Sequence, residues 1–146
     1  MSSLERDGVV GMTSYTEKHE FVSKEEIALL ARVRNMVEKL PNFNFAVSCH
    51  MLSRAIAPLT GLKVKTGWFF TAGWNHSWLE TSQGNIIDVY PWAQIGGPVL
   101  LCTKYFSPWK KIFLSVPAET MYEDPDVIGD PKKIERIRKT LEEMGL

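Results

Sequence analysis

The chain has few cysteines, no excess charge of either sign and no long hydrophobic run. Its 2 cysteines among 146 residues are too few for the disulfide framework of a small secreted domain. Its 17 basic and 17 acidic residues give a formal net charge of zero, so no general attraction to nucleic acid or to an anionic membrane is expected. No stretch of about 18 apolar residues occurs that could cross a bilayer.

The first seven residues also lack the apolar centre of a secretory signal. These absences predict a soluble protein of a reducing compartment, and we expect a cytoplasmic location, where a free thiol stays usable. An apolar content of 45% and a charged content of 23% are typical of globular proteins. The length predicts a single domain over residues 1–146, with residues 1–20 as a loosely ordered arm in which Val9-Val10 could add an edge strand.

Two helices have clear sequence signals at their ends. Ser23 followed by Glu26 forms a capping box, and the apolar stripe behind it continues until Pro41 stops the helix. Near the C-terminus, Asp130 caps a last helix that has Pro131 at its first position. One face of this last helix carries Ile134, Ile137, Leu141 and Met144, and Gly145 ends it.

Another helix, between these two, carries a cysteine near its start. Either Asn44 or Ser48 can cap it, and either choice leaves Cys49 in the first turn or shortly after it. The helix is expected to end before Pro58 and Gly61. A cysteine in this place is of chemical interest because a helix N-terminus carries partial positive charge and exposed amide donors.

From Gly61 the apolar period changes from that of a helix to that of strands. Strands are predicted at 62–69, 76–81, 85–90, 99–106 and 111–116. Short turns separate them, which favours an antiparallel meander over parallel β-α-β units. The sequence therefore predicts an α+β domain in which helices pack on an antiparallel sheet.

The hairpin between the second and third of these strands can place a histidine beside an aspartate. If 82–84 is a three-residue loop with a left-handed glycine, Thr81 lies opposite Asn85. His76 and Asp88 are then diagonal neighbours on one face of the sheet, within reach of a hydrogen bond. A two-residue loop would put them on opposite faces.

The order of these motifs resembles the transglutaminase-like core, a branch of the papain-like cysteine enzymes. The residues that carry the resemblance are Cys49 with Ala55, the strand 61–68, His76-Ser77-Trp78-Leu79-Glu80, and Asp88-Val89-Tyr90-Pro91. It covers residues 44–91. The resemblance implies a papain-like fold, in which the cysteine-bearing helix packs on an antiparallel sheet and a C-terminal helix follows.

The resemblance also implies a catalytic triad of Cys49, His76 and Asp88. The enzyme would be a hydrolase, thiol proteases included, or an acyltransferase, and it would act on an amide or thioester through a thioester intermediate. Asn44 or Asn75 is the candidate side-chain donor to the oxyanion, beside the backbone N–H of Cys49. The partner would be a peptide or another acyl-bearing substrate, with neither nucleic acid nor membrane involved.

Several tryptophans surround the predicted site. Trp74 and Trp92 are expected at the rim of a substrate groove, and Trp78 either shields the site at that rim or fills the core. No cofactor and no metal are expected. Adjacent helical residues such as Cys49 and His50 point about 100° apart, which does not suit a shared metal.

An inactive binding module is the competing hypothesis. The family often has a tryptophan directly after the cysteine, where this chain has His50, and it commonly has proline directly after the aspartate, where Pro91 here comes three residues later. No tryptophan precedes Cys49 to assist an oxyanion site. A chain with these differences could keep the fold and bind a partner without turnover.

Overall fold

The computed structural model describes residues 9–10, 22–69, 74–90, 97–104, 108–115 and 125–146, and it has an α+β architecture. The strands are β1 (Val9–Val10), β2 (Lys63–Phe69), β3 (Trp74–Glu80), β4 (Ile86–Asp88), β5 (Val99–Leu101) and β6 (Phe113–Ser115). The helices are α2 (Lys24–Glu38), α3 (Cys49–Thr60), α4 (Trp109–Ile112), α6 (Pro125–Ile128) and α7 (Pro131–Glu143). The class predicted from the sequence is therefore confirmed at this coarse level.

The strands form one sheet in the order β1-β5-β4-β3-β2-β6, and every neighbouring pair is antiparallel. Strands β2 to β5 follow one another as the predicted meander, and β6 returns to pair with β2. The possible edge strand at Val9-Val10 is confirmed, because β1 pairs with β5 at one end of the sheet. The rest of the expected arm lies outside the described residues.

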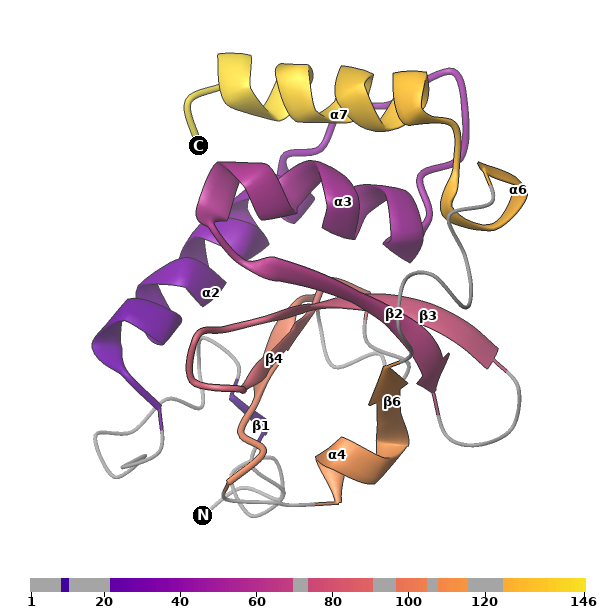
Figure 1. Cartoon of the computed structure of the whole chain (residues 1–146). Coiled ribbons are helices and arrows are strands. Elements are labelled where there is room, and N and C mark those ends of the chain that lie inside the picture. Colours follow the sequence, from indigo (N-terminus) through magenta and orange to yellow (C-terminus); the bar gives the residue numbers. More distant parts are fainter. Residues whose placement is uncertain (1–8, 11–21, 70–73, 91–96, 105–107, 116–124) are drawn as a thin grey trace.

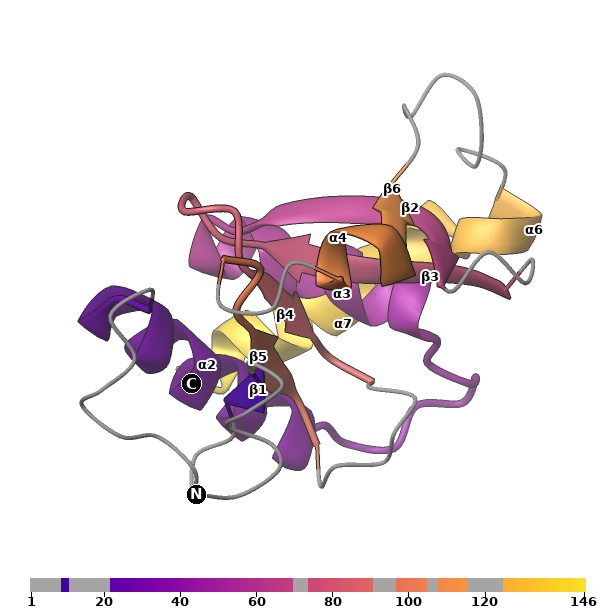
Figure 2. The same ribbon diagram turned by 90° about the horizontal axis from the view of Figure 1, so that it is seen from below.

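Helices α2, α3 and α7 pack on one side of this sheet. Helix α3 lies between α7 and the strands β2 and β3, while α4 lies below the sheet, on the side away from α3 (Figure 1). Figure 2, seen from below, likewise shows α4 and β6 in front of β3. No described helix has both the length and the apolar character needed to span a membrane.

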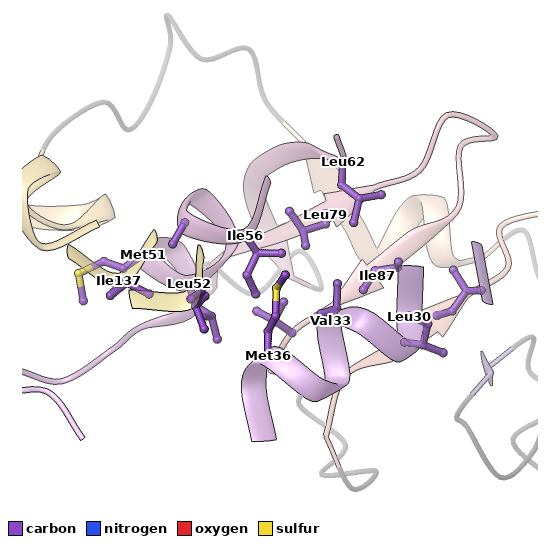
Figure 3. Close-up of a cluster of buried hydrophobic side chains, with 14 of the residues drawn as sticks. Leu30, Val33, Met36, Met51, Leu52, Ile56, Leu62, Leu79, Ile87 and Ile137 are labelled. Carbon is purple, nitrogen blue, oxygen red and sulfur yellow. The ribbon is translucent and has the colours of Figure 1, made fainter. Parts of the chain in front are cut away.

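Alternate residues of the strands pack into two separate apolar clusters. Leu79 and Ile87 face the helices and join the main core with side chains of α2, α3 and α7 (Figure 3). Trp78 lies in a second cluster with Phe113, and their rings meet edge-on with centroids 5.2 Å apart. Because strand side chains alternate between faces, the two clusters line opposite faces of one sheet.

The predicted ends of α2 and α7 are confirmed. The side chain of Ser23 accepts a hydrogen bond from the backbone N–H of Glu26, and the Glu26 carboxylate accepts one from the N–H of Ser23, which completes the capping box. Asp130 caps α7, and Pro131 is its first residue. Ile137 and Leu141 are buried as expected, but Met144 is 40% exposed and does not belong to the apolar face.

Several predicted boundaries are wrong. The strand predicted over residues 99–106 ends at Leu101. Helix α3 does not end before Pro58 but continues to Thr60, where the Thr60 hydroxyl and the N–H of Gly61 both bond to carbonyls of the last turn. Gly61 then ends it in the left-handed conformation, with φ +77°. The strand predicted from residue 111 begins only at Phe113, because residues 109–112 form α4 behind Pro108.

The predicted hairpin register is confirmed. Leu79 pairs with Ile87 and Glu80 with Ile86, which continues to Thr81 opposite Asn85. The turn is closed by bonds from the N–H of Thr81 to the carbonyl of Asn85 (2.9 Å) and from the N–H of Gly84 to the carbonyl of Thr81 (3.0 Å). Gly84 has φ +84°, the left-handed conformation that this loop length requires.

A buried carboxylate fastens this turn to α2. Glu26 is 2% exposed, and its Oε2 accepts hydrogen bonds from the Thr81 hydroxyl (2.7 Å) and the Asn85 amide (2.8 Å). The Asn85 side-chain oxygen in turn accepts from the N–H of Thr103 (3.0 Å), just beyond β5. One side chain of the capping box therefore fixes the helix start and the hairpin turn together.

We expect Glu26→Ala to lower the free energy of unfolding by about 3 kcal/mol, measured by urea denaturation. The substitution removes the charge-assisted hydrogen bonds that the buried Glu26 carboxylate accepts from Thr81 and Asn85. Glu25→Ala is the matched control, since Glu25 is exposed in the same helical turn, and its cost should stay below about 1 kcal/mol. Equal losses in the two variants would contradict a specific role for Glu26.

Candidate functional site

Cys49 is the first residue of α3. Ser48 is the N-cap, and its hydroxyl accepts a hydrogen bond from the N–H of Met51 (3.2 Å). Of the two caps left open by the sequence, Ser48 is thus the one used. The Cys49 thiol is free and half-buried, so it combines partial access to solvent with a place at the positive end of a helix.

His76 and Asp88 form the predicted diagonal pair. The ring nitrogen Nε2 of His76 lies 3.0 Å from each oxygen of the Asp88 carboxylate, so an Nε2–H donates to it. Both side chains are buried, with exposed fractions of 3% and 1%. The N–H of Tyr90 donates to Asp88 Oδ1 (3.1 Å) and holds the carboxylate in place. This arrangement fixes both the orientation and the tautomer of the imidazole.

The Cys49 side chain lies close enough to His76 to act, together with Asp88, on the protonation of its ring. Burial lowers the pKa of His76, but its hydrogen bonds with Asp88 and Cys49 and the negative charges of both outweigh burial and raise that pKa to about 9. The three residues predicted to act together are thus brought together, with an imidazole that favours its charged form.

Aromatic side chains enclose the histidine. The rings of Trp78 and Phe113 each have their centroid 6.2 Å from that of His76. Trp78 is only 1% exposed, so the prediction that it lines a substrate rim is wrong, and the core reading holds. The reason is its position on the second face of the sheet, where it is covered by Phe113 from β6.

The other predicted site residues lie apart from this centre or outside what the structure describes. Asn44 is exposed, and its Oδ1 accepts a hydrogen bond from Arg136 of α7 (2.8 Å), which occupies that oxygen on the helix surface. Asn75 is exposed on β3, directly before His76. Trp74 begins β3, but its side chain is not among those described, and Trp92 lies outside the described residues.

A buried polar network next to the triad was not found from the sequence. His50 Nδ1 lies 2.7 Å from the hydroxyl of Ser77, which also lies 2.8 Å from the hydroxyl of Thr66. Arg54 donates to Ser77 (3.0 Å) and to Thr66 (2.7 Å). Two signals were available in the sequence: His50 and Arg54 are four residues apart on one helix, and Ser77 is next to His76. Neither signal predicts that the helix residues contact Ser77, because that contact depends on how the helix docks on the sheet.

This network holds the start of α3, and with it Cys49, beside β3. Cys49 lies near His76, and the next residue on each element makes a hydrogen bond, between His50 and Ser77. Two consecutive pairs hold the start of α3 against β3. Burial, the Arg54 guanidinium and His76 together lower the pKa of His50 to about 4, so this imidazole is neutral at pH 7 and serves as a hydrogen-bonding group.

Tyr90 is a further neighbour of the thiol. Burial, followed by the negative charge of Cys49, raises the pKa of its phenol. Tyr90 is 37% exposed, and it follows two residues after Asp88. The same register that puts Thr81 opposite Asn85 puts Tyr90 opposite His76, although no role was predicted for Tyr90 from the sequence.

Nothing in the described part of the chain forms a metal site, since no group of three or more His, Cys, Asp or Glu side chains converges there. Comparison of the chain with protein-family models, with curated proteins and with solved structures found no match.

We expect the His76 ring to titrate near pH 9 rather than near its ordinary 6.5, followed by the NMR shift of its Cε1 proton. The imidazolium is the form that Asp88 and Cys49 stabilise, so Asp88→Asn should bring the midpoint down by at least about one pH unit. His76→Ala assigns the resonance. A midpoint near 6.5 in the unmodified chain would contradict the described contacts.

His50 predicts a loss of stability in acid. Its pKa is about 4 in the folded chain and about 6.5 when unfolded, so the unfolded chain binds more protons between these values. Stability is therefore fully present above pH 6.5 and falls as the pH drops through 4, by on the order of 3 kcal/mol. The measurement is the free energy of unfolding of the unmodified chain minus that of the His50→Asn variant, followed as a function of pH. The asparagine keeps a hydrogen-bonding group near the position of Nδ1 but does not titrate. A difference independent of pH would contradict a neutral, buried His50.

Proposed function

We propose that the chain is a cysteine-dependent hydrolase or acyltransferase that acts on an amide or thioester through Cys49, His76 and Asp88. The observation that carries the proposal is that His76 is held by Asp88 through Nε2 and that the nearby Cys49 and Asp88 both favour its protonated form. A nucleophile, a base and a group that orients the base are the minimum set for nucleophilic acyl transfer.

Because His76 favours its protonated form, the reaction would begin with attack of the Cys49 sulfur, as the thiolate, on the substrate carbonyl carbon. The tetrahedral intermediate would collapse to a thioester as the imidazolium gives its proton to the leaving amine or thiol. His76 would then deprotonate water, in a hydrolase, or an acceptor amine or alcohol, in a transferase. Attack on the thioester would release the acyl group and restore the thiol.

The oxyanion would be met first by the backbone N–H of Cys49, which is available at the start of α3. Asn75 is the better of the two proposed side-chain donors, because it directly precedes His76 and is exposed. Asn44 is bonded to Arg136 instead. Trp74 and Trp92 stay proposed rim residues.

The fold proposed for this activity is papain-like, of the transglutaminase-core type. Support comes from a cysteine that opens a helix packed on the sheet and from a histidine and an aspartate on successive strands of that sheet. A peptide or another acyl-bearing molecule is the proposed substrate, and a cytoplasmic location would keep the thiol reduced.

The alternative, a binding module without turnover, is favoured by one observation. Asn44, one of the two candidate oxyanion donors, is held by Arg136 on the surface of α7. This leaves Asn75 as the one proposed side-chain donor, and the loss of one such donor typically costs about 100-fold or more in rate.

We expect iodoacetamide to alkylate Cys49 at pH 6–7 at least about tenfold faster than it alkylates free cysteine, because the helix start and the imidazolium stabilise the thiolate. Cys102→Ala serves as background, so that Cys49 is the one thiol measured; Cys102 itself is buried. His76→Ala should remove most of the acceleration, and the matched His50→Asn should retain more of it. The rates follow from mass spectrometry of the intact protein.

A small activated thioester then separates the two hypotheses. The enzyme should acquire a transient mass of one acyl group on Cys49 that water or an added amine removes. Alkylation no faster than that of free cysteine would contradict the enzyme hypothesis. Fast alkylation with a stable, unreleased acyl group would favour the binding module.

A further inference from the structure

A hollow of about 360 Å³ lies on the surface of α7 and is independent of the cysteine site. It is lined by Asn44, Phe45, Lys132, Lys133 and Arg136. Three of these five side chains are cationic, although the whole chain has no net charge. The hollow is formed where the segment between α2 and α3 runs along α7 before it turns down to Cys49 (Figure 1).

The central cation of this hollow is held from two directions. Arg136 Nη1 donates to Asn44 Oδ1 (2.8 Å), and the guanidinium carbon lies 5.7 Å from the centre of the Phe43 ring and 5.8 Å from that of Phe45. The two rings stack on each other with centroids 5.2 Å apart. Hydrogen bonding and cation–π contact thus restrict the guanidinium before any ligand arrives, which lowers the entropy cost of binding.

A second cation is placed in the same way, since Lys133 Nζ lies 5.3 Å from the centre of the Phe45 ring. The nearby acidic groups are engaged elsewhere. Asp130 accepts from the backbone N–H of Lys132 (2.9 Å), and Glu135 is paired with Arg138. Among the described residues, no carboxylate forms an ion pair with Lys132, Lys133 or Arg136.

The contrast with the next turns of α7 shows that this arrangement is local. Arg138 is neutralised by two carboxylates, Glu135 and Glu142. The helix therefore separates into a first part with uncompensated positive charge over aromatic rings and a second part with paired charges. An ordinary basic helix face, in which each cation is only solvated, would not show the stacked rings under the cations or the hydrogen bond from Arg136 to Asn44.

We propose that this hollow binds the phosphate group of a small phosphomonoester. A planar guanidinium with free N–H groups can donate to two phosphate oxygens, and the lysine ammonium groups supply further charge. The faces of Phe45 are already used by the cations, so the rings position the donors rather than stack on the ligand. The site does not depend on Cys49, and it can therefore hold where the proposed acyl transfer fails.

The test follows the backbone amide shifts of α7 during a titration with glycerol 3-phosphate at constant ionic strength. We expect saturable shifts of residues 132–136, with sodium chloride giving none. Arg136→Gln should weaken binding at least about tenfold, since it removes the bidentate donor. Lys139→Gln is the matched control: it removes one positive charge from the same helix outside the hollow, and binding should change less than about twofold.

Further arms identify the source of the phosphate. Inorganic phosphate should bind at the same residues but more weakly, and vesicles that contain phosphatidic acid should not bind more tightly than the monoester. Equal weakening by Arg136→Gln and Lys139→Gln would overturn the proposal, because only diffuse charge would then be at work. Shifts that rise without saturation, or a clear preference for the vesicles, would overturn it as well. Cys49→Ala should bind like the unmodified chain, which separates this result from the fate of the proposed function.

Discussion

The hydrogen bond between His76 and Asp88 depends on the length of one turn. Side chains alternate faces along a strand, so a loop one residue shorter would place the two groups on opposite sides of the sheet. Gly84 allows the three-residue loop by adopting a positive φ, and Glu26 fixes the loop from α2 through Thr81 and Asn85. The imidazole is thus oriented by a constraint whose parts lie at the far end of the hairpin.

The docking of α3 is the second requirement. The hairpin, fixed by α2, orients His76, but the thiol comes near it only because the start of α3 meets β3. The network of His50, Ser77, Thr66 and Arg54 adds buried and partly buried hydrogen bonds to the apolar packing of α3 on the sheet. Such bonds have narrow distance and angle limits, so they specify one placement of the helix more sharply than methyl groups would.

Local signals in the sequence predicted most of the elements and the hairpin register. Ser23, Asp130 and Gly84 act through their own backbone neighbours, so their effects could be deduced without a tertiary structure. Interactions between distant segments could not be deduced. The engagement of Asn44 by Arg136 across 92 residues has no local signature, nor does the covering of Trp78 by Phe113. The extension of α3 past Pro58 was missed because proline rules describe helix interiors better than last turns.

The two contacts of His76 differ in how far they reach along the chain, which has a consequence for nascent and damaged molecules. Asp88 is 12 residues from the histidine, within one hairpin, whereas Cys49 belongs to a helix that must first pack on the completed sheet. A chain in which α3 has not docked would therefore keep the pair of His76 and Asp88, while Cys49 would lie away from it. The enhanced reactivity of Cys49 would then appear late in folding and be lost early in unfolding. In misfolded copies the thiol would react no faster than an ordinary cysteine.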